Sequence, residues 1–130
     1  MSTIFHLCKF IFTKEISIGR IVINKNNTEE VVVGAIGHLY TPNAERGIFK
    51  TFDGGKTWNL VGENNGYGYG SCVQFVPGSD GNELVTVGAS GVFYSYNQGK
   101  SWKKIADYKD LFTLRFVDSK TAIAAGNKKI

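Results

Sequence analysis

Short apolar runs separated by turn-forming residues recur along the chain. The runs are rich in β-branched and aromatic residues, and none of the longer stretches shows apolar spacing at the helical period. Turn chemistry lies between the runs, in the pairs Asn26-Asn27 and Asp118-Ser119 and in the Pro-Gly-Ser-Asp-Gly segment 77–81. This pattern predicts an all-β chain with essentially no helix.

The apolar runs define the expected strands. In chain order these are residues 20–24, 31–34, 47–51, 58–61, 71–76, 83–88, 91–95, 102–105, 112–117 and 121–126. Residues 31–34, 85–88 and 123–126 are each a short apolar run that ends in Gly, so we expect them to be equivalent strands.

An internal repeat organises these strands. Residues 47–58 recur as residues 91–102, at an offset of 44 residues. Four strands per unit at this period are typical of a β-propeller blade. We therefore predict blades at residues 18–61 and 71–106 and an incomplete blade at 112–130, with residues 1–17 as a strand of a preceding blade.

Each repeat contains an octet that joins the third and fourth strands of its unit. The residues with matching roles are Thr51, Asp53, Gly55, Thr57 and Trp58 in the first copy, and Ser95, Asn97, Gly99, Ser101 and Trp102 in the second. A short carboxylate or amide can accept backbone N–H bonds within a turn, and Gly tolerates a positive φ. The indole can pack against the sheet. We interpret these residues as structural, and this turn role accounts for Asp53 without a catalytic or calcium-binding function.

The octets resemble the Asp-box, or BNR repeat, of sialidase-like β-propellers. Residues 18–61 resemble one blade of the sortilin-like bacterial proteins often labelled glycosyl hydrolase. Residues 71–130 resemble the last blades of photosystem II assembly-factor-like propellers, some of which are labelled oxidoreductase. The resemblance implies an all-β partial propeller of four-stranded antiparallel blades, two complete and one partial, with relatives that are often secreted or periplasmic.

The chain length of 130 residues sharpens this expectation. Propellers close with about four to eight blades, so two blades and part of a third do not form a ring. We expect a fragment of a larger bacterial protein, or a partial ring that self-associates to cover its open edges. Exposed apolar blade surface and association in solution are the expected consequences.

Composition excludes several classes of function. The 16 Gly and 9 Phe residues and the 20% charged content exclude disorder and coiled coil. The net charge of +4 is spread along the chain, which gives no nucleic-acid signature. Cys8 and Cys72 form neither a disulfide framework nor a metal motif, and the spacing of the two His residues does not favour a metal either. The Gly66–Gly70 run does not follow the dinucleotide-binding pattern, so we expect no metal and no cofactor.

The first stretch, residues 1–12, is apolar but is interrupted by His6 and Lys9. It lacks a basic leader and a small-residue cleavage site, so it makes a poor signal peptide, and it is too short to span a membrane. The compartment is therefore left open by the sequence.

Two loops are the candidate ligand-binding segments. The spacing from Gly34 to Asp53 is 19 residues, whereas that from Gly88 to Asn97 is 9, which places an insertion at 38–46. It is expected on the same face as the blade-to-blade connection 62–70. Their polar and aromatic residues suit a carbohydrate or protein ligand: His38, Tyr40, Asn43, Glu45, Arg46, Glu63, Asn64, Tyr67 and Tyr69. The alternative is that these residues only organise the loops.

Catalysis is the second class of function to weigh. A sialidase needs an arginine cluster, and the chain holds Arg20, Arg46 and Arg115 without a recognisable acid loop. Glu45 and Glu63 are the acidic residues expected on the loop face, and a hydrolase would need them about 5 to 10 Å apart around one pocket. The sequence favours a non-catalytic binding or scaffold module. The alternative is part of a carbohydrate-active, sialidase-like glycoside hydrolase whose catalytic blades are missing.

Overall fold

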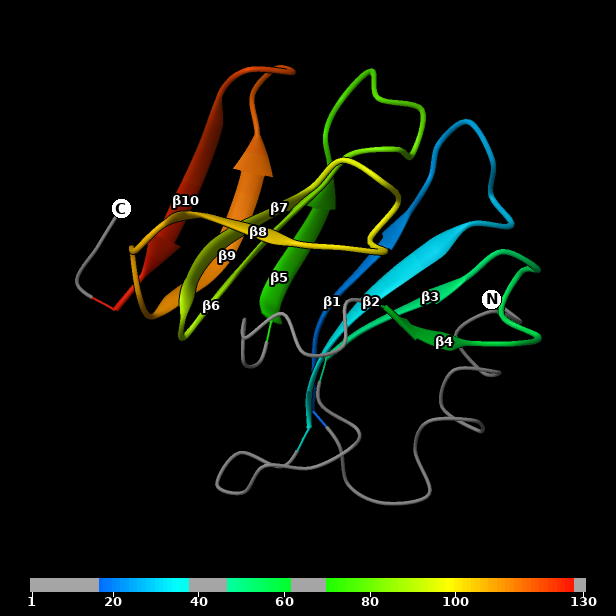
Figure 1. The fold of residues 1–130 in the computed structure, drawn as a ribbon, viewed down its shortest axis with the longest axis horizontal. Helices are drawn as coiled ribbons and strands as arrows, with labels where there is room; N and C mark the ends of the chain where they lie inside the picture. The colour runs from blue at the N-terminus through cyan, green and yellow to red at the C-terminus, as the bar shows by residue number, and fades with distance from the viewer. Residues whose placement is uncertain (1–16, 38–46, 62–69, 128–130) are drawn as a thin grey trace.

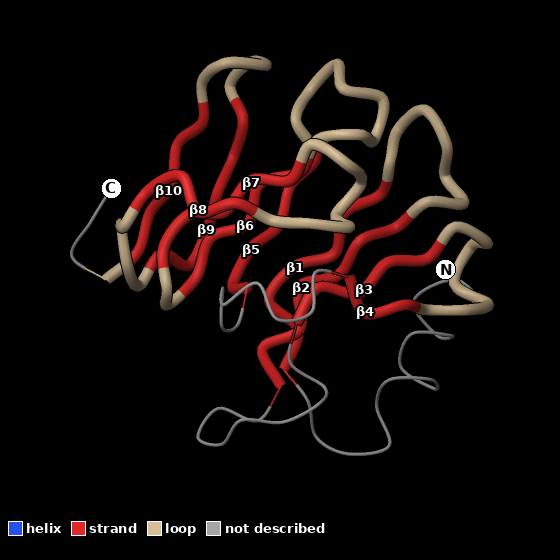
Figure 2. Tube along the Cα trace, in the orientation of Figure 1, coloured by secondary structure: helices blue, strands red, loops and turns tan. Residues whose placement is uncertain are grey.

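The computed structural model describes residues 17–37, 47–61 and 70–127, and these contain strands and turns but no helix (Figures 1 and 2). The strands are β1 (Ser17–Ile23), β2 (Val31–Gly37), β3 (Gly47–Thr51), β4 (Asn59–Val61), β5 (Gly70–Phe75), β6 (Leu84–Gly88), β7 (Gly91–Ser95), β8 (Lys103–Ala106), β9 (Leu111–Phe116) and β10 (Ala122–Gly126). No helix in these ranges is long and apolar enough to cross a membrane.

The strands form three antiparallel sheets that follow one another along the chain. Their orders are β1-β2-β3-β4, β5-β6-β7-β8 and β10-β9. The first strands lie side by side, because β1 contacts β5 and β5 contacts β9, and the sheets fan out from them (Figure 1). The architecture is a partial β-propeller. We call the first two sheets blade 1 and blade 2, and the β9–β10 sheet partial blade 3.

The strand ends differ slightly from those expected. β1 begins at Ser17 and β2 continues to Gly37, because the two strands stay paired as far as the Ser17–Gly37 partners. The inner strands of blades 1 and 2 approach so closely that a Cβ on Gly19 would collide with the backbone carbonyl of Ser71. A glycine at this position therefore allows the two blades to meet.

The expected equivalence of residues 31–34 with 85–88 is wrong by one position. Val31 pairs with Thr51, and Leu84 pairs with Ser95, which occupies the place of Thr51 in the second repeat. Residues 31–34 therefore match 84–87. The glycines that end the runs are therefore not at equivalent positions. The difference matters because a one-residue shift in a strand moves every side chain to the opposite face.

The core lies between consecutive blades rather than within one sheet. Val32 and Ile48 of blade 1 pack with four residues of blade 2: Val73, Leu84, Phe93 and Trp102. A second cluster joins blade 2 to partial blade 3 and includes Cys72, Val85, Leu111 and Leu114. The Cys72 thiol is buried there, with its sulfur 3.7 Å from the Leu114 carbonyl oxygen. Each blade thus buries its apolar face against the next.

A buried ion pair of blade 1 lies at the interface with blade 2. The Lys50 side chain on β3 is fully buried and forms a salt bridge with Glu30. Its Nζ also donates to the Gln98 carbonyl oxygen of blade 2 at 3.1 Å. Asn24 Nδ2 donates to the second Glu30 oxygen at 2.7 Å. Burial lowers the pKa of the Lys50 ammonium, and the hydrogen bond to Glu30 opposes that shift.

Removing one member of this pair should strongly destabilise the chain. We expect Lys50→Ala to lower the free energy of unfolding by roughly 3 to 5 kcal/mol, because Glu30 would be left buried without its cation. The double variant Lys50→Met, Glu30→Gln should recover much of this loss, since it removes both charges while keeping side-chain volume. Urea unfolding measures both quantities.

Lys25→Ala is the matched control, because Lys25 is exposed and its loss should change stability by less than about 0.5 kcal/mol. A Lys50→Ala variant that unfolds at the same urea concentration as this control would show that the buried pair contributes nothing.

Candidate functional site

The loop residues proposed to bind a ligand lie outside the described residues. This applies to His38, Tyr40, Asn43, Glu45, Arg46, Glu63, Asn64, Tyr67 and Tyr69. The separation of Glu45 and Glu63, on which the hydrolase hypothesis depends, falls in the same segments. These candidates remain predictions, and the described candidates are the octets and a groove beside blade 2.

The first octet is a closed network of hydrogen bonds. The Thr51 hydroxyl donates to Asp53 Oδ1 at 2.7 Å and accepts from the Gly55 amide at 3.0 Å. Asp53 also accepts from the Thr57 amide at 2.9 Å and from its hydroxyl at 2.6 Å. The Trp58 indole N–H donates to the Gly55 carbonyl at 3.0 Å. Gly55 has a φ of 91°, which suits glycine.

The second octet reproduces this network with an amide in place of the carboxylate. The Ser95 hydroxyl donates to Asn97 Oδ1 at 3.0 Å and accepts from the Gly99 amide at 2.9 Å. The Ser101 amide donates to Asn97 Oδ1 at 2.9 Å. One bond reverses direction, because Asn97 Nδ2 donates to the Ser101 hydroxyl at 2.8 Å. The turn therefore forms with or without a negative charge.

The electrostatics of Asp53 fit a turn-stabilising carboxylate. Hydrogen bonds from the Thr57 side chain and amide, and then from Thr51, lower the pKa of Asp53 to about 2. A carboxylate held in this way stays ionised at neutral pH and is a poor proton donor. Its oxygens are engaged within the turn, which leaves no geometric indication of catalysis.

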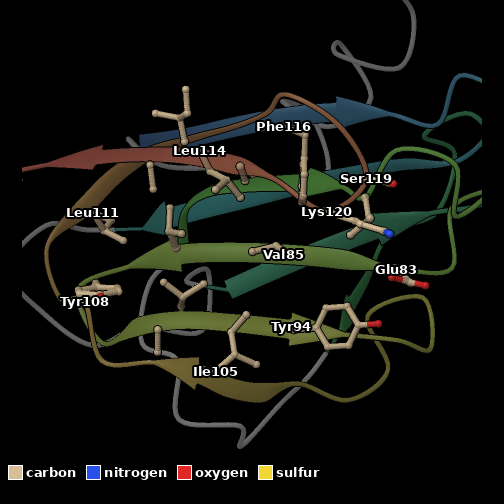
Figure 3. Close-up of a pocket in the computed structure, with 17 residues that line it drawn as sticks. Glu83, Val85, Tyr94, Ile105, Tyr108, Leu111, Leu114, Phe116, Ser119 and Lys120 are labelled. Carbon is tan, nitrogen blue, oxygen red and sulfur yellow. The ribbon is translucent and has the colours of Figure 1, made fainter. Parts of the chain in front are cut away.

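A groove lies between the outer half of blade 2 and partial blade 3. The cavity has a volume of about 980 Å³ and is lined mainly by apolar side chains. Val85 and Ile105 line it from blade 2, and Leu111 and Phe116 line it from partial blade 3 (Figure 3). Ile123 of partial blade 3 lines it as well. We call it the blade 2–3 groove. Its volume is in the range of pockets that bind ligands.

Polar groups gather at one end of the groove. Glu83, Tyr94, Ser119 and Lys120 lie there, whereas Tyr108 lies at the other end (Figure 3). Burial raises the pKa of the Tyr94 hydroxyl, and its hydrogen bond with Glu83 raises it further. Tyr94 is therefore neutral at physiological pH. The arrangement offers one carboxylate, hydroxyl groups and an ammonium beside an apolar wall.

Two arginines lie in the described ranges, Arg20 on β1 and Arg115 on β9. With the Gln74 amide oxygen facing Arg20, that oxygen accepts from Nε at 3.1 Å and from Nη2 at 2.8 Å. Arg20 thus ties β1 to β5 across the interface. Arg115 is exposed on β9, and Arg46 falls outside the described residues.

Known structures now identify the fold. The chain has the fold of GH74 propeller enzymes. An ancestral GH74 enzyme matches 76% of this chain with a TM-score of 0.54 and 20% sequence identity. The GH74 enzyme of Niastella koreensis matches 76% of this chain with a TM-score of 0.57 and 20% identity.

This likeness is partial in length. The chain spans only 14% of the ancestral GH74 enzyme and 17% of the Niastella koreensis enzyme. No protein-family model matches the sequence, and no curated protein matches it. At this identity the GH74 structures establish the propeller fold alone, and the residues have to carry any argument about function.

Sequence reasoning missed the blade 2–3 groove. Its residues looked like ordinary strand positions, because Val85 and Ile123 fit the alternating or apolar pattern of buried strands. The sequence did indicate that the last unit contains two predicted strands, whereas the first two units contain four each. Among the residues that the structure describes, no group of three or more His, Cys, Asp or Glu side chains is placed to hold a metal ion.

The two octets predict different responses to acid. The pKa of Asp53 falls from 3.8 to about 2 on folding, so its stabilising contribution is present above pH 3.8 and is lost as the pH falls toward about 2. Asp53→Asn should remove this contribution, since Asn97 shows that an amide fits the turn. We expect the melting temperature of the wild type to fall more steeply than that of the variant over this pH interval.

The reciprocal variant is the control. Asn97→Asp should add the same acid sensitivity to blade 2, because Ser95 and Ser101 can donate to a carboxylate there. Identical pH slopes for the wild type and Asp53→Asn would contradict the assigned role of Asp53.

Proposed function

We propose that this chain is a non-catalytic binding module built from Asp-box propeller blades and belongs to a larger propeller protein. The observation that carries the proposal is the blade 2–3 groove, which has a volume of about 980 Å³ and is lined mainly by apolar side chains. The two octet turns support the Asp-box assignment, because in each the glycine amide donates to the first hydroxyl and the second Thr or Ser amide donates to the Asp or Asn side chain.

The chemistry of the groove favours binding over bond cleavage. Glycoside hydrolysis uses two carboxyl groups about 5 to 10 Å apart on either side of the scissile bond. Glu83 is the single carboxylate among the residues that line the groove. The groove lining supplies no second carboxyl group to act as acid or nucleophile.

The apolar walls also bear on the class of ligand. Ile105, Tyr108 and Ile123 each line the groove while remaining more than half exposed. Apolar surface of this kind, rimmed by a few polar groups, is typical of sites that bind proteins. Of the carbohydrate and protein ligands considered from the sequence, the groove favours a protein.

A hydrolase remains the second candidate, and the structural neighbours favour it. Both matched structures are GH74 enzymes, and this chain covers a small share of each. In that case the chain would be one part of a carbohydrate-active glycoside hydrolase, and catalytic carboxylates would come from other blades.

Two assays on the full chain separate these functions. Binding of a hydrophobic dye such as anilinonaphthalene sulfonate should be reduced by Ile123→Lys, which places a charge in the groove. Phe112→Lys should leave it unchanged, because Phe112 is 56% exposed, as is Ile123, but does not line the groove. No hydrolysis of polysaccharides or aryl glycosides above the buffer blank is expected.

The opposite pattern would overturn the proposal. Hydrolysis that copurifies with the chain and disappears in Glu83→Gln would establish an enzyme. Equal dye binding by the wild type, Ile123→Lys and Phe112→Lys would show that the groove is not the binding surface.

A further inference from the structure

The chain contains two Asp-Gly dipeptides, Asp53-Gly54 in the first octet and Asp80-Gly81 in the loop between β5 and β6. Asp-Gly is chemically labile, because the glycine amide nitrogen can attack the aspartyl side-chain carboxyl without hindrance from a Cβ. Ring closure forms a succinimide and expels water. Hydrolysis of the ring takes up water again and leaves aspartate or isoaspartate, in which the backbone runs through the former side-chain carboxyl. The fold holds the two dipeptides differently.

The first octet withholds both reacting groups of Asp53-Gly54. Asp53 Oδ1 accepts from the Thr51 hydroxyl and the Thr57 amide, and Oδ2 accepts from the Thr57 hydroxyl. The Gly54 amide donates to the Glu29 carbonyl oxygen at 3.0 Å. The bonds from Thr57 first, and then that from Thr51, lower the pKa of Asp53 from 3.8 to about 2. The protonated carboxyl, which is the form that loses water, is therefore scarce at mildly acidic pH.

The turn around Asp80-Gly81 leaves both groups available. The Asn82 amide donates to the Ser79 carbonyl oxygen at 3.1 Å, and φ is 53° at Asp80 and 80° at Gly81. Positive φ at both central residues is typical of a type I′ turn. Within the described ranges, no hydrogen bond from the Gly81 amide is found. The Asp80 carboxyl is exposed, and its Oδ1 accepts one bond, from Asn26 Nδ2 at 3.1 Å.

This turn also touches the buried ion pair. Gly81 is buried, and a Cβ there would collide with Asn24 Nδ2 and lie 2.8 Å from Glu30 Oε2. Glu30 is the partner of Lys50 in the salt bridge of blade 1. Isoaspartate adds a methylene to the backbone at residue 80, so the turn lengthens and Gly81 cannot keep its place against Asn24 and Glu30.

We propose that Asp80-Gly81 is a site of spontaneous isoaspartate formation, and that this modification loosens the packing of blade 2 on the Lys50–Glu30 pair. Asp53-Gly54 is its protected counterpart in the same chain. The reaction needs no partner other than solvent water, so the proposal is independent of what the blade 2–3 groove binds.

Ageing of the full chain at mildly acidic pH, in buffer and in urea, tests the proposal. Peptide mapping with electron-transfer fragmentation distinguishes isoaspartate from aspartate at each position. In buffer we expect isoaspartate at residue 80 to exceed that at residue 53 roughly tenfold or more, because the fold lowers the protonated fraction of Asp53. In urea the two sites should react at similar rates, since the dipeptides are identical. Deamidation at Asn65-Gly66 is told apart by its gain in mass.

Matched variants separate the geometry of the octet from the ionisation of Asp53. Asp53→Asn and Asp80→Asn each place an uncharged amide before glycine, and ring closure then expels ammonia instead of water. Asp53→Asn should react roughly tenfold more slowly than Asp80→Asn, because the Gly54 amide must first break its bond to the Glu29 carbonyl. Asp80→Glu should be inert at residue 80, since closure would require a larger and less favourable ring.

Urea unfolding measures the structural consequence. The unfolding midpoint of the aged wild type should fall in proportion to its isoaspartate content at residue 80, whereas aged and fresh Asp80→Glu should unfold at the same urea concentration. Melting curves establish that each fresh variant is folded.

Two results would overturn the modification site: equal isoaspartate at residues 53 and 80 in buffer, or none at residue 80 in buffer while the urea-unfolded chain reacts there. Equal rates for Asp53→Asn and Asp80→Asn would overturn the protection assigned to the Gly54–Glu29 bond. Isoaspartate at residue 80 with an unchanged unfolding midpoint would overturn the link to the buried pair.

Discussion

Coverage of one blade by the next is the constraint on which this fold depends. A single four-stranded sheet with apolar residues on both faces has no core of its own. Blade 1 buries Ile48 against apolar side chains of blade 2, and it buries Lys50 beside the Gln98 carbonyl of that blade. Blade 2 presents Val92 and Tyr94 at the same positions, but partial blade 3 covers them incompletely. The blade 2–3 groove lies where, among the described residues, β9 and β10 are the strands that face blade 2.

The two interfaces also differ in how deeply they bury their ionisable groups. In the closed interface, Lys50 and Glu30 satisfy each other, and Asn24 and Gln98 supply further hydrogen bonds. A lysine at position 94 would sit at a partly wet surface and would be solvated whenever the groove was open. Tyrosine carries no charge at neutral pH, and burial raises the pKa of Tyr94 further from neutrality. It therefore suits a position that is only partly buried.

The octets and the strand pattern were predictable because their causes are local. The bonds among Thr51, Asp53 and Thr57 lie within one short turn, so the sequence specifies them directly. The burial of Lys50 was not predictable, because it depends on Gln98 in the next blade. The groove escaped prediction for the same reason: the exposure of Ile123 reflects which strands are next to β10 and not the pattern of β10 itself. The loop candidates fall outside the described residues and stay predictions.

The buried thiol of Cys72 gives the chain an internal reporter of blade separation. Its sulfur lies against the Leu114 carbonyl, between β5 and β9. Because the thiol is buried, an alkylating reagent should reach it when the structure opens locally, and its rate of modification would report that opening. A partner that holds the two blades together would slow this chemistry without touching the cysteine. Cys72 is therefore a native probe of local opening at this interface.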